Sequence, residues 1–154
     1  MEIADLLGPG SVIASLRVTS KKQALQEIAR RMAPLAGLHE RAIFDVLWQR
    51  ERIGTTGMGM GTAIPHGKVA GLARLVGLFA RLERPIDFEA MDERPVDLIF
   101  VLLAPESAGA DHLKALARVS RLLRDRATCK KLRGTDNVDA LTAILTDRAA
   151  SHAA

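Results

Sequence analysis

The chain has 154 residues, 48% of them hydrophobic and only 3% aromatic, which suits one domain with an aliphatic core. Its 22 Lys and Arg and 18 Asp and Glu leave a formal charge of +4. Because both signs are interspersed and few aromatic rings could stack on bases, the composition argues against nucleic-acid binding and favours a solvated, mildly basic surface. Such a surface could attract an acidic protein partner.

Nothing in the sequence predicts a secreted or membrane-inserted protein. Met1 to Asp5 lack the basic start of a signal peptide. The longest fully apolar run, Leu98 to Ala104, is too short to span a bilayer. A single cysteine, Cys129, cannot form an internal disulfide, which fits a reducing compartment. We therefore expect a cytoplasmic protein.

The first third of the chain predicts a strand and two helices. After the turn signal Gly8-Pro9-Gly10, residues 12–18 form a strand candidate. Ser20 followed by Gln23 predicts a capping box that opens a helix ending near residues 34–37. Its apolar face consists of Ala24, Leu25, Ile28, Met32 and Leu35.

A second helix is expected over residues 39–53, with Arg50 on the same face as Val46 and Leu47. Two interpretations of Arg50 stay open at this point. Its stem could lie along the edge of the core, or its guanidinium could point at the glycine-rich segment that follows. The neighbouring Glu51 is expected to point elsewhere.

The glycine-rich segment, residues 57–68, has the pattern of a site for a phosphoryl group. Gly57, Gly59 and Gly61 alternate, and glycine backbone can approach an anion closely. Pro65 and Gly67 flank His66, which predicts an imidazole held on a stiff loop. A histidine that carries a phosphoryl group needs a neutral nitrogen, a fixed tautomer and nearby donors.

The rest of the chain predicts two strands and three helices. Residues 75–82 form a strand candidate and 85–88 a short extended piece, whereas the apolar run 96–103 before Pro105 is typical of a strand buried on both faces. In a helix over 111–124, His112 lies in the first turn on the stripe of Leu116, Val119 and Leu123, at the end that favours anions. Helices over 128–132 and 136–145, the second with Asp136 as N-cap, complete a domain of residues 1–148. Residues 149–154 are expected to be a disordered tail.

Two other kinds of site are weaker interpretations of the same residues. His66 and His112 with a carboxylate could hold zinc in a hydrolase, but no H-x-x-x-H or C-x-x-C spacing occurs. The glycine run does not have the G-x-G-x-x-G spacing of a dinucleotide-binding loop, and no strand–loop–helix unit surrounds it.

The segment Gly61-Thr62-Ala63-Ile64-Pro65-His66-Gly67-Lys68 resembles the active-site segment of the IIA proteins of the bacterial phosphoenolpyruvate-dependent phosphotransferase system, and most of all their nitrogen-regulatory branch. Further matching stretches are Arg50-Glu51-Arg52-Ile53-Gly54-Thr55-Thr56-Gly57, Pro95 to Phe100 and His112-Leu113. The resemblance runs from about Ile3 to about Leu145. It implies an α/β (α+β) domain of the type-2, mannitol-type IIA fold, with a small mixed sheet flanked by helices.

The resemblance also implies a function and its residues. His66 would accept a phosphoryl group, through Nε2, from an HPr-like phosphocarrier. His112 would hydrogen-bond the phosphoryl oxygens or the imidazole, and Arg50 would offset charge. Backbone donors would come from Gly57, Gly59, Gly61 and Gly67. Neither a metal nor a cofactor is implied, because the donor is an activated phosphoramidate.

The partners implied by the nitrogen-regulatory branch are the carrier and regulated proteins such as potassium transport or sensor kinase components. Met60 stands where sugar-specific relatives tend to have an acidic residue, which favours the regulatory branch. Two alternatives stay open: a regulatory interaction module that passes no phosphoryl group onward, and the IIA component of a sugar-specific transporter.

Overall fold

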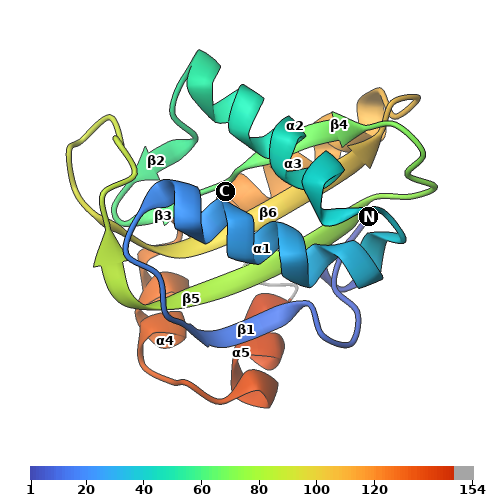
Figure 1. Ribbon diagram of the computed structural model, residues 1–154. Coiled ribbons are helices and arrows are strands. Elements are labelled where there is room, and N and C mark those ends of the chain that lie inside the picture. Colours follow the sequence, from blue (N-terminus) through green and yellow to red (C-terminus); the bar gives the residue numbers. More distant parts are fainter. Residues whose placement is uncertain (148–154) are drawn as a thin grey trace.

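A computed structural model describes residues 1–147 of the chain (Figure 1). A short 3₁₀ helix, Ile3–Asp5, precedes the first strand. The strands are β1 (Val12–Leu16), β2 (Gly57–Gly59), β3 (Thr62–Ala63), β4 (His66–Val69), β5 (Val76–Ile86) and β6 (Val96–Pro105). The helices are α1 (Lys21–Ala36), α2 (Glu40–Ile53), α3 (Ala110–Arg124), α4 (Arg126–Arg133) and α5 (Val138–Leu145).

The six strands form one mixed sheet in the order β1-β5-β6-β3-β2, and β4 also pairs with β6. Strands β3 and β4 occupy successive parts of the same edge of β6, and both run parallel to it. Strand β5 pairs with the other edge of β6 in the antiparallel sense, and β1 runs parallel to β5. The small mixed sheet flanked by helices is therefore confirmed.

Helices cover both faces of the sheet. Figure 1 shows α1 and α2 on the near face and α3, α4 and α5 behind it. Strand β6 supplies both cores, because its successive side chains point to opposite faces. Leu98, Phe100 and Leu102 pack with the residues of α3 to α5. Ile99 and Val101 pack with those of α1 and α2. Burial of β6 on both faces is as the sequence predicts.

The start of α1 follows the expected cap with one change. Ser20 Oγ accepts a hydrogen bond from the Gln23 N–H at 3.1 Å, as in a capping box. The Gln23 side chain, however, reaches back to the N–H of Thr19 at 2.7 Å instead of that of Ser20. The helix ends at Gly37, whose φ of 68° is the left-handed conformation that favours glycine.

Several boundaries differ from the sequence prediction; β1 ends at Leu16, two residues early, and β6 continues through Pro105. The segment expected as a loop contains β2, β3 and the start of β4, because β3 and β4 pair with β6 and β2 pairs with β3. Strand β5 joins the two pieces expected separately at 75–82 and 85–88, and α4 is longer than expected. The cap of α5 is Asn137 and not Asp136, since its side chain accepts from the Ala140 N–H at 2.9 Å. The expected tail, 149–154, lies outside the described residues.

Candidate functional site

His66 is the first residue of β4 and is held by its own chain. Its Nδ1 lies 2.7 Å from the carbonyl oxygen of Ile64. Because a carbonyl can only accept, Nδ1 carries the proton and Nε2 keeps its lone pair. Burial and the positive charge of Arg50 lower the pKa of His66, although the bond to Ile64 and the charge of Glu51 act in the opposite direction. The imidazole is therefore neutral at neutral pH, with Nε2 available as a nucleophile.

His112 lies beside His66. The two ring centroids are 5.9 Å apart and the planes are tilted by 49°. His112 is 8% exposed, and its buried Nδ1 has no hydrogen-bond partner among residues 1–147. Burial first, then the neighbouring His66 and Lys68, lower the pKa of His112. A second neutral imidazole thus lies beside the first, and its Nδ1 is buried without a hydrogen-bond partner in the described part of the chain.

The sheet brings the two histidines together. Strand β4 places His66 opposite Leu102 in the middle of β6. The chain leaves the sheet at Pro105 and returns as α3, which begins at Ala110. His112 is therefore in the first turn of α3, where unpaired backbone N–H groups favour an anion. Gly109, the residue that precedes the helix, makes no side-chain cap that would occupy them.

Arg50 lies in the last turn of α2, close enough to His66 for its charge to lower the pKa of that histidine. Its Nη1 donates to the carbonyl oxygen of Gly54 at 2.8 Å, which satisfies a backbone acceptor beyond the helix end. The residue is partly exposed, as a stem along the edge of the core with its guanidinium at the surface would be. It contributes positive charge to the site.

Gly67 lets α2 approach β4. A Cβ at this position would overlap Val46 Cγ1. Val46 lies one turn before Arg50 on α2, and Gly67 directly follows His66 on β4. The absence of a side chain at Gly67 therefore lets the turn of α2 that precedes Arg50 lie against β4.

The other three glycines shape a hairpin. Met60 and Gly61 both have positive φ, 59° and 80°, and join β2 to β3 as the two-residue turn that glycine favours in hairpins. A Cβ at Gly57 would overlap Ala90, and the nearest side chain to Gly59 is Asp92. The N–H of Met60 donates to the Asp92 carboxylate at 2.9 Å. The neighbours of Gly57, Gly59 and Gly61 are thus side chains that pack around the hairpin, namely Ala90, Asp92, Asp97 and Arg133.

Met60, the departure from the sugar-specific pattern, lies at the tip of this hairpin and is 42% exposed. Its Sδ accepts from Arg94 Nη1 at 3.4 Å, and its carbonyl oxygen accepts from Arg133 Nη2 at 2.9 Å. The residue therefore belongs to a cluster formed with Arg94 and Arg133.

Glu51 is a residue that the sequence analysis misplaced. It does not point to solvent but is only 4% exposed. Its carboxylate accepts from the N–H of Thr56 at 2.8 Å and from Thr56 Oγ1 at 2.6 Å, and Lys21 Nζ lies 3.3 Å away. Helical spacing could have found it, because Ile43, Leu47 and Glu51 follow each other at intervals of four residues.

Through Thr56, Glu51 is connected to the nucleophile. The N–H of Ile64 donates to the Thr56 carbonyl oxygen at 3.1 Å, and the Ile64 carbonyl oxygen accepts from His66 Nδ1. A continuous set of hydrogen bonds thus runs from a buried carboxylate to the ring of His66.

Lys68 is a second residue to which the sequence analysis gave no role. It lies two residues after His66 on β4, and its side chain is therefore on the same side of the strand.

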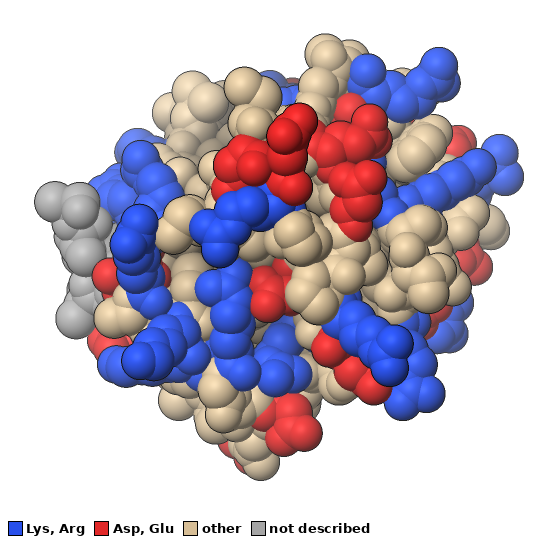
Figure 2. Space-filling view, turned by 90° about the vertical axis from the view of Figure 1, so that its left-hand side faces the viewer, with Lys and Arg blue, Asp and Glu red and all other residues tan. Residues whose placement is uncertain are grey.

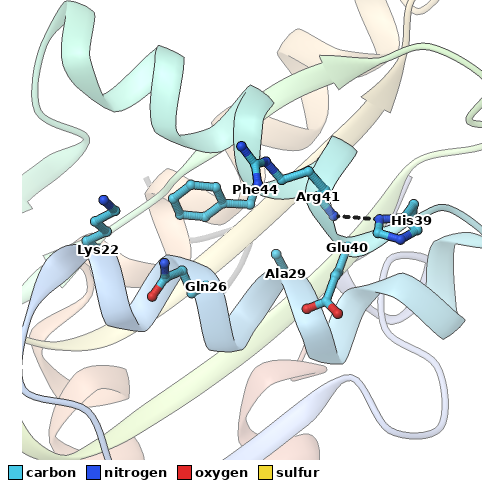
Figure 3. A pocket seen from close by; sticks show the side chains of 7 residues that line it. All are labelled: Lys22, Gln26, Ala29, His39, Glu40, Arg41 and Phe44. Carbon is cyan, nitrogen blue, oxygen red and sulfur yellow. Dashed lines mark hydrogen bonds between the residues drawn. The ribbon is translucent and has the colours of Figure 1, made fainter.

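His39 lies away from this site, in a hollow between α1 and α2 (Figure 3). The hollow is lined by Lys22, Gln26, Ala29, His39, Glu40, Arg41 and Phe44. His39 Nδ1 accepts from the Arg41 N–H at 3.1 Å, so this histidine caps α2. Within residues 1–147, no three His, Cys, Asp or Glu side chains are grouped so that they could hold a metal ion. No helix in that range is long and apolar enough to cross a membrane.

The arrangement suits acceptance of an anionic group by a neutral nitrogen. Nε2 of His66 is unprotonated, a second imidazole adjoins it, and Arg50 and Lys68 supply positive charge. Positioning and electrostatics of this kind are the main requirements of phosphoryl transfer.

Comparisons with known proteins show the family of the chain. Residues 5–148 match the model of the family described as phosphoenolpyruvate-dependent sugar phosphotransferase system, EIIA 2. The nitrogen regulatory protein of Bradyrhizobium diazoefficiens is 59% identical over 145 residues, which cover 94% of this chain and 95% of that protein.

Solved structures show the same fold. The nitrogen regulatory protein IIA-Ntr from Neisseria meningitidis has a TM-score of 0.89 at 34% identity, over 94% of this chain and 99% of that one. IIA mannitol from Escherichia coli, at 17% identity, has a TM-score of 0.77 over 90% of this chain and 98% of its own, and shows the fold alone. The chain therefore belongs to the EIIA type-2 family of the phosphoenolpyruvate-dependent phosphotransferase system, in its nitrogen-regulatory branch.

Proposed function

We propose that His66 accepts a phosphoryl group from the phosphohistidine of an HPr-like phosphocarrier, and that its phosphorylation state regulates partner proteins in the cytoplasm. The observation that carries the proposal is the bond from His66 Nδ1 to the Ile64 carbonyl oxygen, at 2.7 Å. It directs the lone pair of Nε2 away from the backbone and fixes the tautomer that a nucleophile needs.

In the transfer step, the Nε2 lone pair of His66 attacks the phosphorus atom of the donor. The phosphorus–nitrogen bond of the donor breaks, and its electron pair returns to the donor imidazole. His66 keeps the proton on Nδ1, hydrogen-bonded to Ile64, and the positive charge that develops on its ring is offset by the incoming phosphoryl group. The step consumes one phosphoramidate and forms another, so it needs no metal or cofactor to balance.

The neighbours of His66 stabilise the transferred group. His112 would donate to a phosphoryl oxygen, because the centroid of its ring lies 5.9 Å from that of His66. Arg50 and Lys68 would offset a negative charge of about two units. Gly67 would bring α2 close enough for Arg50 to act. We assign Gly57, Gly59 and Gly61 to the shape of the hairpin, because their nearest contacts are Ala90, Asp92, Asp97 and Arg133.

A new charge beside exposed protein surface is sufficient to change which partner binds. On this basis the regulated partners include components of potassium transport or sensor kinases, as the nitrogen-regulatory branch implies. A regulator that passes no phosphoryl group onward remains the second candidate, because no carboxylate stands at Met60. Transfer of label from the phosphorylated protein to a IIB-type acceptor would support a phosphocarrier, and a sugar-specific IIA component would show it too. A regulatory module would show no such transfer.

The test is intact mass after incubation with phosphoenolpyruvate, enzyme I and the HPr-like carrier. Wild type should gain a single acid-labile phosphoryl group, His66→Ala none, and His112→Ala should gain it more slowly. His39→Asn is the matched control, because it removes an imidazole outside the site while keeping an N-cap side chain, and it should label as wild type does. Normal labelling of His66→Ala would overturn the assignment.

A further inference from the structure

A second hollow of about 500 Å³ lies between the β2–β3 hairpin and the region where α3 meets α4. Its lining consists of Met58, Gly59, Met60, Thr62, Leu123, Arg124, Arg126, Cys129, Lys130 and Arg133. Figure 2 looks onto the side of the molecule that carries β2 and α4. Lys and Arg side chains gather on the lower part of that side, and the largest group of Asp and Glu lies above them. We call the hollow the hairpin groove.

The charge of the hairpin groove is of one sign. Four cations line it and no carboxylate does. Arg124, Arg126 and Lys130 form no ion pair within residues 1–147. Three of the four cations thus lack a carboxylate partner in this range, and only Arg133 has one, Asp97. Like charges so placed repel one another, and an anionic ligand relieves that repulsion.

One of the four cations is already held in place. Arg133 Nε lies 3.0 Å from both carboxylate oxygens of Asp97, and its Nη2 lies 2.8 Å from one of them. The same Nη2 donates to the Met60 carbonyl oxygen at 2.9 Å, whereas Nη1 has no partner in the described part of the chain. A fixed guanidinium loses little freedom when it binds a carboxylate or phosphate.

The wall of the groove is apolar. Leu123 and Cys129 are 2% and 5% exposed and belong to the core beneath α3 and α4. Met58 packs against the same core and is partly buried, and a flexible thioether adapts to ligands of different shape. The groove thus combines a cationic rim with an apolar wall, which suits a ligand that has both characters.

We propose that the hairpin groove binds a small organic anion, with a carboxylate or phosphate on the cations and an apolar body against Met58 and Met60. Its volume lies within the range of about 300–1,000 Å³ that is usual for small-molecule sites. A docked protein would need a contact surface on the order of 800 Å² on each side, with an apolar centre. Of the large exposed apolar side chains in residues 1–147, only Met60 lines the groove, so the small ligand is favoured.

This site is distinct from that of His66, because Leu123 lies eleven residues along α3 from His112, roughly 16 Å at the helical rise. The two are nevertheless joined through the hairpin: Thr62 lines the groove and precedes Ile64, which holds His66. Binding in the groove does not depend on phosphorylation of His66 and can be measured without it.

The experiment is a titration of ¹⁵N-labelled protein with naphthyl phosphate, followed by amide chemical shifts. Saturable shifts are expected at Met58, Met60, Leu123 and Lys130. Inorganic phosphate, which lacks the apolar body, and naphthol, which lacks the charge, should each bind at least tenfold more weakly. Equal binding of inorganic phosphate, or no saturable shift with naphthyl phosphate, would overturn the proposal.

Two variants locate the site. Lys130→Gln combined with Arg126→Gln should weaken naphthyl phosphate about tenfold or more. Lys131→Gln, an exposed neighbour on α4 that does not line the groove, should leave binding unchanged. Equal weakening by Lys131→Gln would mean that net charge alone attracts the probe. Tighter binding of an acidic, leucine-containing peptide than of naphthyl phosphate would overturn the small-ligand assignment in favour of a protein partner.

Discussion

Replacing Gly67 by alanine tests whether the contact between β4 and α2 sets the geometry of the site. A Cβ at Gly67 would overlap Val46 Cγ1. Strand β4 cannot easily retreat, because it is paired with β6 and Gly67 lies opposite Leu103. The added methyl group must therefore move Val46, and with it the turn of α2 that leads to Arg50.

The expected cost follows from two opposing effects. Forcing an extra methyl group into a packed contact costs about 1–3 kcal/mol. Replacing glycine reduces the freedom of the unfolded chain, which returns about 0.4–1 kcal/mol where the native backbone tolerates alanine. We expect Gly67→Ala to lower the free energy of unfolding by about 1–2 kcal/mol and to slow phosphorylation of His66.

Val46→Ala removes the atom that the new methyl group meets. In that background, Gly67→Ala should be neutral or slightly stabilising, so the two changes should couple by about 1–3 kcal/mol. Urea unfolding of the four proteins of this cycle measures the coupling. Gly8→Ala is the control, because a Cβ at Gly8 meets nothing within 4 Å. An equal loss from Gly67→Ala in both backgrounds would refute the argument.

Three further predictions concern the histidines, the buried carboxylate and a helix cap. Burial lowers the pKa of both His66 and His112 below the usual 6.5. The unfolded chain therefore binds more protons than the folded chain in the acidic range. The contribution of these histidines to stability is full above about pH 6.5 and is lost as the pH drops. His66→Gln should reduce this loss of stability when urea unfolding is measured between neutral and acidic pH. Parallel curves of unfolding free energy against pH for the variant and wild type would contradict the lowered pKa of His66. Glu51→Gln should lower the free energy of unfolding by about 1–3 kcal/mol, because it weakens the bonds to Thr56. It should also alter the ¹⁵N chemical shifts of the His66 ring. Unchanged ring shifts would show that Glu51 does not act on His66. Ser20→Ala should cost about 1 kcal/mol in thermal unfolding; a loss of a few tenths or less would show that the cap at α1 contributes little.

Much of the fold could be predicted from local patterns. The apolar run of β6 indicated a strand buried on both faces, and its alternating side chains do supply both cores. Ser20 marked the start of α1 because capping is a contact between near neighbours in the chain. The stripe that placed His112 on the inner side of α3 is likewise a matter of helical spacing.

What sequence reasoning missed depends on pairing between distant segments. The glycines at 57, 59 and 61 suggested a loop, but Met60 and Gly61 form a hairpin turn because β2 pairs with β3 in the antiparallel sense. The burial of Glu51 depends on Thr56 and Lys21 meeting it from two other elements. Glu51 was expected to point away from the face of Val46 and Leu47, and helical spacing does not show that a carboxylate would find buried partners.

The most direct test of the central claim is to locate the phosphoryl group on the ring of His66. Long-range ¹H–¹⁵N spectra of the phosphorylated protein distinguish the two ring nitrogens. Because Nδ1 donates to the carbonyl oxygen of Ile64 at 2.7 Å, the phosphoryl group should be on Nε2 while Nδ1 keeps its proton. A phosphoryl group on Nδ1, or on any residue other than His66, would contradict the proposed site.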